Sequence, residues 1–78
     1  MQLSRLVYMA NQIGKFFVSE DDETAVPAIA DHLKKFWDPG MRAEIIAHLA
    51  AGGEGLDPEV RDAVAMLTKH HHSPIEGG

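Results

Sequence analysis

Apolar residues recur at intervals of three and four positions along most of this chain of 78 residues. This spacing places the side chains on one face of an α-helix. The first segment predicts a helix of about four turns, and its apolar face is formed by Leu3, Leu6, Val7, Ala10, Ile13, Gly14 and Phe17. Met9 and Phe16 widen that face, which then needs cover on more than one side. No stretch alternates with a period of two, so the pattern indicates an all-α fold.

Prolines and glycines mark where the other helices begin and end. Pro27 cannot donate a backbone hydrogen bond, so we expect it in the first turn of a second helix, with Thr24 or a neighbour as the N-cap. Asp38 and Asp57 each precede a proline, and each pair predicts an N-cap followed by the first residue of a helix. The glycines within residues 52–55 can adopt positive φ, which predicts a helix end and a reversal there.

The sequence therefore predicts an all-α domain, a small bundle of four helices. Two longer N-terminal helices are expected to pack as a hairpin, and two shorter helices to close one end. Residues 1–69 form this helical domain in the prediction. The periodicity stops beyond Lys69, so residues 70–78 are expected to form a flexible tail rich in His and Gly.

Composition and charge argue against several functional classes. Seven Lys and Arg against twelve Asp and Glu give a net charge of −5, and the basic residues are scattered, which argues against nucleic-acid binding. The longest apolar runs are far shorter than the ~20 residues of a membrane span, and the N-terminus lacks the pattern of a secretory signal. The chain has no cysteine, hence no disulfide or thiolate metal site, and we expect a cytoplasmic protein.

No group of residues has the spacing of a catalytic or cofactor-binding site. Asp31 and His32 are adjacent and point about 100° apart on a helix, so the carboxylate cannot orient the ring for general base catalysis. The glycines at 52–55 lack the lysine and the preceding strand of a phosphate-binding loop. We therefore predict no catalytic residue and no bound cofactor. One alternative is weak metal binding through the imidazoles of His70, His71 and His72.

One stretch stands out at the expected corner between the second and third helices. The only tryptophan lies there with an arginine, and both residue types are enriched in interface hot spots. A core role for the tryptophan is compatible with this interpretation. The arginine falls in the first turn of its helix, where the dipole disfavours a positive charge, so we expect it to pair with an acidic group of a partner. The predicted partner-binding residues are Trp37, Asp38, Pro39, Met41 and Arg42 at the corner, with Met9 and Phe16 on the first helix.

Three motifs make the sequence similar to a known family. They are MANQIGKFF at 9–17, IADHLKKFWDPGMR at 29–42 and GGEGLDP at 52–58, in this order and at natural spacing. With them the chain resembles the delta subunit of NAD-dependent formate dehydrogenase, from residue 3 to about residue 66. These dehydrogenases are soluble bacterial enzymes with a molybdenum cofactor.

The resemblance implies a non-catalytic accessory chain in a larger enzyme. In such a complex, a large alpha subunit holds bis-molybdopterin guanine dinucleotide and oxidises formate, while other subunits carry electrons through iron-sulfur clusters and flavin to NAD. The delta chain would support assembly, stability or cofactor maturation, with the alpha subunit as its partner. Because the broad apolar face of its first helix lacks a cover, the isolated chain is expected to self-associate or to melt at a low temperature. An independent helical adaptor or regulatory domain that binds another protein is the alternative, beside metal binding by the histidines.

Overall fold

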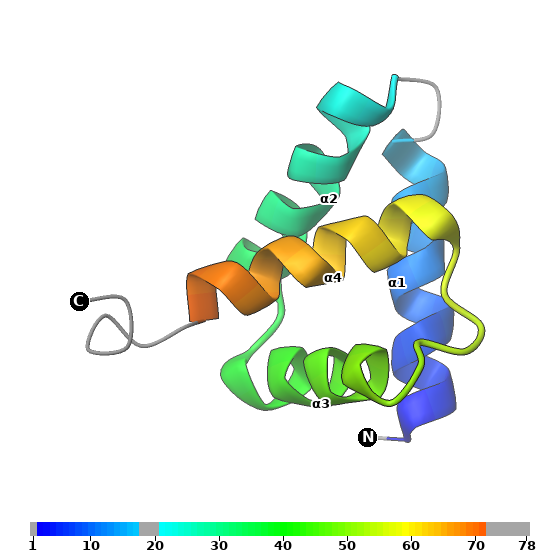
Figure 1. Ribbon diagram of the computed structural model, residues 1–78, viewed down its shortest axis with the longest axis vertical. Helices are drawn as coiled ribbons and strands as arrows, with labels where there is room; N and C mark the ends of the chain where they lie inside the picture. The colour runs from blue at the N-terminus through cyan, green and yellow to red at the C-terminus, as the bar shows by residue number, and fades with distance from the viewer. Residues whose placement is uncertain (1, 18–20, 72–78) are drawn as a thin grey trace.

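A computed structural model describes residues 2–17 and 21–71, without the side chains of residues 22 and 69–71. These residues form four α-helices and no strand, which confirms the all-α prediction. The helices are α1 (Leu3–Phe17), α2 (Asp22–Phe36), α3 (Pro39–Ala50) and α4 (Pro58–His71), as Figure 1 shows. None of these four helices has the length and apolar composition to cross a membrane.

The start of α2 differs from the prediction. Asp21 is the N-cap, and its carboxylate accepts a hydrogen bond from the backbone N–H of Thr24 at 3.1 Å. Pro27 therefore lies inside α2, beyond the first turn, and its predicted place in the first turn is wrong. A proline inside a helix leaves the carbonyl four residues earlier, here that of Glu23, without its intrahelical donor. Because Glu23 is exposed, water can satisfy that carbonyl.

The start and the end of α3 follow the prediction. The Asp38 carboxylate accepts from the backbone N–H of Met41 at 2.8 Å, and a proline occupies the first helical position. This arrangement satisfies one of the backbone donors that every helix start leaves free. The reversal beyond α3 uses left-handed backbone at three glycines, with φ of 126°, 65° and 89° at Gly52, Gly53 and Gly55.

The last helix is longer than predicted. α4 runs from Pro58 to His71, so it has 14 residues against 15 in each of α1 and α2. It therefore includes His70 and His71, which the sequence analysis assigned to the tail. Residues 72–78, with His72, lie outside the described residues, and a flexible tail there stays a prediction.

α4 lies across the bundle. In Figure 1, α1 and α2 diverge from one end of the molecule, α4 crosses between them, and α3 lies below. α4 packs most extensively against α2 and also contacts α3 and α1, while α1 and α2 contact each other as predicted for a hairpin. The buried core is formed by Leu6, Ala10, Ala25, Ile29, Ala30, Leu33, Trp37, Ile45, Leu56, Val60, Ala63, Val64 and Leu67.

A buried glycine lets α1 and α4 approach each other. A Cβ atom added to Gly14 would lie 2.5 Å from Cγ2 of Val60, whose side chain is completely buried. Nonbonded carbon atoms prefer separations of about 3.5–4.0 Å. The crossing therefore depends on the absence of a side chain at Gly14.

Asn11 fastens the connection between α3 and α4 to α1. Its side-chain amide donates to the carbonyl of Gly55 at 2.8 Å, and its side-chain oxygen accepts from the backbone N–H of Asp57 at 3.0 Å. The Asp57 carboxylate also lies 3.4 Å from Nζ of Lys15. Asn11 thus supplies both a donor and an acceptor to a backbone segment more than 40 residues away.

Two further side chains hold the same connection from its own flanking helices. Nε2 of His48, on α3, lies 2.7 Å from the carbonyl oxygen of Glu54. The guanidinium of Arg61, on α4, donates to the carbonyl of Gly52. Polar side chains from three helices therefore satisfy carbonyls of a segment that forms no ladder of its own.

Replacing Asn11 by alanine is expected to lower the free energy of unfolding by about 1–1.5 kcal/mol, because two hydrogen bonds to the backbone are lost. Urea unfolding followed by circular dichroism measures this change. Gln12→Ala is the matched control, since Gln12 is the next residue and is exposed; we expect a change within about 0.5 kcal/mol. Equal free energies of unfolding for the two variants would show that the hydrogen bonds of Asn11 do not stabilise the fold.

Candidate protein-binding surface

Four rings form a continuous row from α1 to α2. The ring centroids of Phe16 and Phe17 are 5.0 Å apart, those of Phe17 and His32 6.4 Å, and those of His32 and Phe36 4.7 Å. The two inner residues are half-buried. Phe16 at one end is 79% exposed, and Phe36 at the other end is 72% exposed. We call these four residues the aromatic row.

The aromatic row borders an apolar groove. The groove has a volume of about 290 Å³ and is lined by Gln12, Ile13, Phe16, Phe17 and His32. No lysine, arginine or carboxylate is among these lining residues. Because a charged group buried there would lack a compensating partner, the groove favours an apolar side chain as its occupant. Exposed aromatic residues beside an apolar hollow are typical of protein–protein contacts.

The residues predicted to bind a partner at the corner have different surroundings. Trp37 is 5% exposed and belongs to the core, so its ring is covered by this chain itself. Met41 is half-buried and packs against the same core. Asp38 and Pro39 are exposed, and the Asp38 carboxylate caps α3. The exposed aromatic residue at this end of α2 is Phe36, which the sequence analysis did not select.

The two residues predicted on the first helix also differ from each other. Met9 is half-buried and packs against the core, whereas Phe16 is largely exposed. The structure therefore groups Phe16 with His32 and Phe36, whereas Trp37 lies in the core. Helical periodicity alone could not reveal this grouping, because it shows which residues share a face of one helix and not which helix covers that face.

Arg42 has a partner within the chain. Its Nη1 donates to the backbone carbonyl of Lys34 at 2.6 Å. Lys34 lies in the last turn of α2, where carbonyls lack intrahelical partners and the dipole favours a positive charge. This contact was not predicted from the sequence: a side chain disfavoured by its own helix caps the preceding one. Pairing of Arg42 with an acidic group of a partner stays a prediction.

Replacing Arg42 by alanine is expected to lower the free energy of unfolding of the isolated chain by about 1 kcal/mol, because the hydrogen bond to the end of α2 is lost. Thermal unfolding of the purified chain measures the change. Arg5→Ala serves as the control, because Arg5 is an exposed arginine near the start of α1. The same melting temperature for both variants would argue against a capping role.

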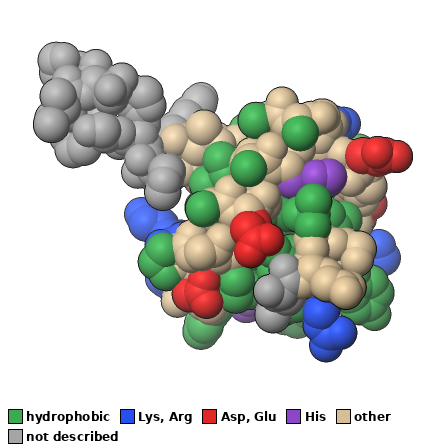
Figure 2. All heavy atoms as spheres, turned by 90° about the horizontal axis from the view of Figure 1, so that it is seen from below, with side chains coloured by type: hydrophobic (Ala, Val, Ile, Leu, Met, Phe, Trp, Pro, Cys, Tyr) green, Lys and Arg blue, Asp and Glu red, His purple; other side chains and the backbone are tan. Residues whose placement is uncertain are grey.

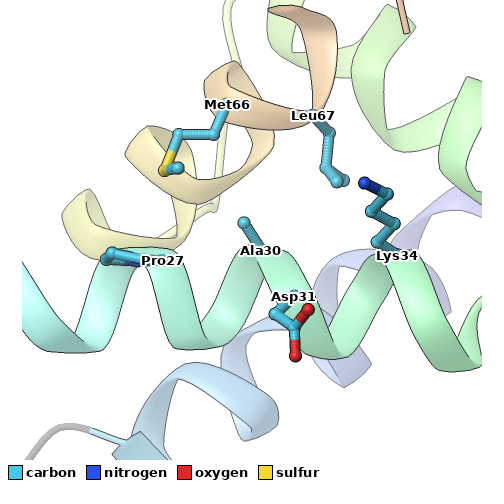
Figure 3. Close-up of a pocket in the computed structure, with 6 residues that line it drawn as sticks. All are labelled: Pro27, Ala30, Asp31, Lys34, Met66 and Leu67. Atoms are coloured by element: carbon cyan, nitrogen blue, oxygen red, sulfur yellow. The ribbon is translucent and has the colours of Figure 1, made fainter. Parts of the chain in front are cut away.

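A smaller groove lies between α2 and α4. Its volume is about 140 Å³, and it is lined by Pro27, Ala30, Asp31, Lys34, Met66 and Leu67. Figure 3 shows Lys34 extended toward Leu67, while the carboxylate of Asp31 points away from α4. Asp31 instead pairs with Lys35 at 3.1 Å. This groove offers about half the volume of the one beside the aromatic row and has no exposed ring.

The face below α3 has mixed chemistry. In Figure 2, hydrophobic side chains there are interspersed with acidic and basic ones. A hollow of about 280 Å³ between α1 and the α3–α4 connection is lined by Leu3, Ser4, Val7, His48 and Glu54. His48 contacts the carbonyl of Glu54, so the histidine of this hollow holds the connection in place.

Metal ligation has no candidate among the residues that the structure describes. Among the side chains described, those of residues 2–17, 21 and 23–68, no three from His, Asp or Glu gather where they could hold one ion. The side chains of His70 and His71, and all of His72, lie outside the description, so metal binding by these histidines stays a prediction.

Comparison with known protein families identifies the family of this chain. Residues 5–64 match the family model of the NADH-dependent formate dehydrogenase delta subunit FdsD. The chain belongs to this family. No curated protein and no solved structure matches it. The matched segment contains the aromatic row, the corner and Asn11, and the resemblance inferred from the three motifs is confirmed.

In this delta-subunit family member the three motifs meet in space. Asn11, from the first motif, binds the backbone of the third motif at Gly55 and Asp57. The second motif supplies Asp38 and Arg42, which cap α3 and α2. The motifs therefore contain the residues that cap α2 and α3 and that bind the α3–α4 connection to α1. The first two motifs also supply all four residues of the aromatic row.

Proposed function

We propose that this chain is a non-catalytic delta subunit that binds another formate dehydrogenase subunit through the aromatic row. Through this contact it supports the assembly, stability or molybdenum-cofactor maturation of the enzyme. The observation that carries the proposal is the 79% and 72% exposure of Phe16 on α1 and Phe36 on α2. Covering apolar surface contributes roughly 25 cal/mol per Å², and large aromatic side chains are frequent anchors of interfaces.

The large alpha subunit is the proposed partner, and the cofactors are proposed to lie on the other subunits. These cofactors are bis-molybdopterin guanine dinucleotide, iron-sulfur clusters, flavin and NAD. Iron-sulfur clusters are held by cysteine thiolates, and this chain has no cysteine. The composition thus supports a role through contact rather than through electron transfer. The lack of cysteine also fits the reducing cytoplasm, where we propose that the complex resides.

Co-purification from cells that produce the enzyme tests the proposal. A tagged chain is expected to retain the alpha subunit, and the retained material is expected to reduce NAD with formate. The isolated chain is expected to show no such activity. Formate-dependent NAD reduction by the isolated chain would contradict its non-catalytic role. Retention of an unrelated protein alone would favour the adaptor alternative, and tight Zn²⁺ binding lost on removal of residues 70–78 would favour the metal-binding one.

Deletion of the delta gene tests the accessory role itself. We expect the remaining enzyme to show a lower molybdenum content per alpha subunit, a lower melting temperature or a smaller assembled fraction. Molybdenum analysis, thermal unfolding and gel filtration separate these three effects. An enzyme unchanged in all three measurements would overturn the accessory role.

A further inference from the structure

We infer that Arg5 and Met9 on α1 extend the aromatic row into a docking strip. The strip binds an apolar segment of a partner subunit, and acidic side chains of the partner flank that segment. The inference rests on the proposed function and specifies the chemistry of its partner. Arg5 precedes Phe16 by eleven residues, which is close to three helical turns, so both project from the same side of α1. Met9 lies between them on that side and is half-buried.

The charge along the docking strip differs from the charge of the whole chain. The net charge of the chain is −5, but α1 contains no Asp or Glu, and its charged residues are Arg5 and Lys15. Lys35 lies one turn beyond His32, at the other end of the strip. Lys15 and Lys35 form exposed ion pairs with Asp57 and Asp31, and such exposed pairs are weak enough to be exchanged for others.

Arg5 has no such pair. Neither of the ion pairs found among the described residues involves it. It also lies in the first turn of α1, where the helix dipole disfavours a positive charge. The fold itself therefore gains nothing from the charge at this position. A carboxylate of a partner subunit would be stabilised by the positive charge of Arg5.

A second copy of the chain does not fit the strip. In a symmetric dimer the patch faces itself, so a positive residue at an end of the strip, Arg5 or Lys35, would meet a positive residue of the second copy. The self-association expected of the isolated chain is therefore weak.

A helix of another subunit is the occupant that satisfies both ends of the strip. Its apolar side chains would enter the groove of about 290 Å³ and cover the exposed rings. Its acidic side chains would face Arg5 beyond one end and Lys35 beyond the other. The charges would set the orientation and the association rate, while the rings would supply most of the affinity.

Charge reversal at two lysine or arginine positions tests the inference in the complex. Arg5→Glu is expected to lower the affinity for the retained subunit roughly tenfold at low ionic strength. Lys34→Glu is the matched control, because Lys34 is exposed on α2 but extends toward the groove with α4, as Figure 3 shows. We expect the control to bind as wild type. At about 1 M salt the three proteins should bind alike, since screening removes the contribution of exposed charges.

The expected loss of affinity does not come from a loss of folding stability. A glutamate in the first turn of α1 agrees with the helix dipole, whereas a glutamate in the last turn of α2 opposes it. Arg5→Glu should therefore melt no lower than wild type, and the control Lys34→Glu should be the less stable variant. Phe16→Ser and Phe36→Ser are expected to weaken retention at every salt concentration.

Two outcomes distinguish a failure of the docking strip from a failure of the proposed function. If Phe16→Ser weakens retention by the dehydrogenase while Arg5→Glu is retained as well as wild type at low salt, the docking strip is wrong and the proposed function stands. If no dehydrogenase subunit retains the wild-type chain, the proposed function and the docking strip fail together.

Discussion

Replacing Trp37 by alanine is expected to lower the free energy of unfolding by about 3–5 kcal/mol, because a buried aromatic side chain is lost and a cavity remains. Trp37 is 5% exposed and packs in the core at the end of α2. Stabilities of small domains begin at about 5 kcal/mol, so a loss at the upper end of this range would leave about half of such a variant unfolded at room temperature. Urea unfolding of the purified chain, followed by circular dichroism, measures the loss.

The neighbouring residue supplies the control for this prediction. Phe36 is also aromatic, but it is 72% exposed. Phe36→Ala is expected to change the free energy of unfolding by less than about 0.5 kcal/mol and to weaken the contact with the partner instead. A stable Trp37→Ala variant that loses only partner binding would show that Trp37 acts mainly in the interface.

Gly14→Ala is expected to destabilise the chain by up to about 2 kcal/mol, because a steric cost outweighs the gain in helix propensity. Alanine favours a helix over glycine by about 1 kcal/mol, but its methyl carbon would lie 2.5 Å from Cγ2 of the buried Val60. Separating α1 from α4 to relieve this overlap costs about 1–3 kcal/mol or more. Since the overlap joins two helices, we expect the steric cost to exceed the gain in helix propensity. Thermal and urea unfolding both measure the net effect.

A double-mutant cycle identifies the cause. Val60→Ala alone should destabilise the chain by about 2 kcal/mol through a cavity, but in the double variant the alanine at 14 fills part of that space. The combined loss should therefore be smaller than the sum by about 1 kcal/mol or more. Gly40→Ala tests a helical glycine that is exposed, where the gain in helix propensity of up to about 1 kcal/mol is opposed only by a contact of 3.3 Å with Oδ1 of Asp38. If the losses of stability from the two single variants were additive, the effect of Gly14→Ala would not arise from its overlap with Val60.

Local signals in the sequence were sufficient to predict the helices. Asp38 before a proline predicted the start of α3, and the glycines of 52–55 predicted its end. These signals operate within a few residues, through caps and allowed φ values. The same logic failed at Pro27, because Asp21 begins the helix earlier and an exposed carbonyl tolerates the missing donor.

The candidate surface was less accessible to prediction, because it depends on contacts between helices. Phe16 and Phe17 have the same side chain and adjacent positions, yet only Phe17 packs against the core. Arg42 was recognised as disfavoured by its own helix, but its acceptor lies on another helix, eight residues earlier. Residues Phe36 and His32 join the aromatic row only through the packing of α2 on α1.

The position of α4 across the bundle has a consequence for synthesis on the ribosome. The helix that packs most extensively against α2 is the last of the four to be translated. Until it emerges, the apolar faces of α1 and α2 lack their cover, and a nascent chain that stops at the α3–α4 connection cannot close its core. The fold, and with it the spacing of Phe16 and Phe36, is thus available to a partner only after translation has passed the core residues of α4, which are Val60, Ala63, Val64 and Leu67.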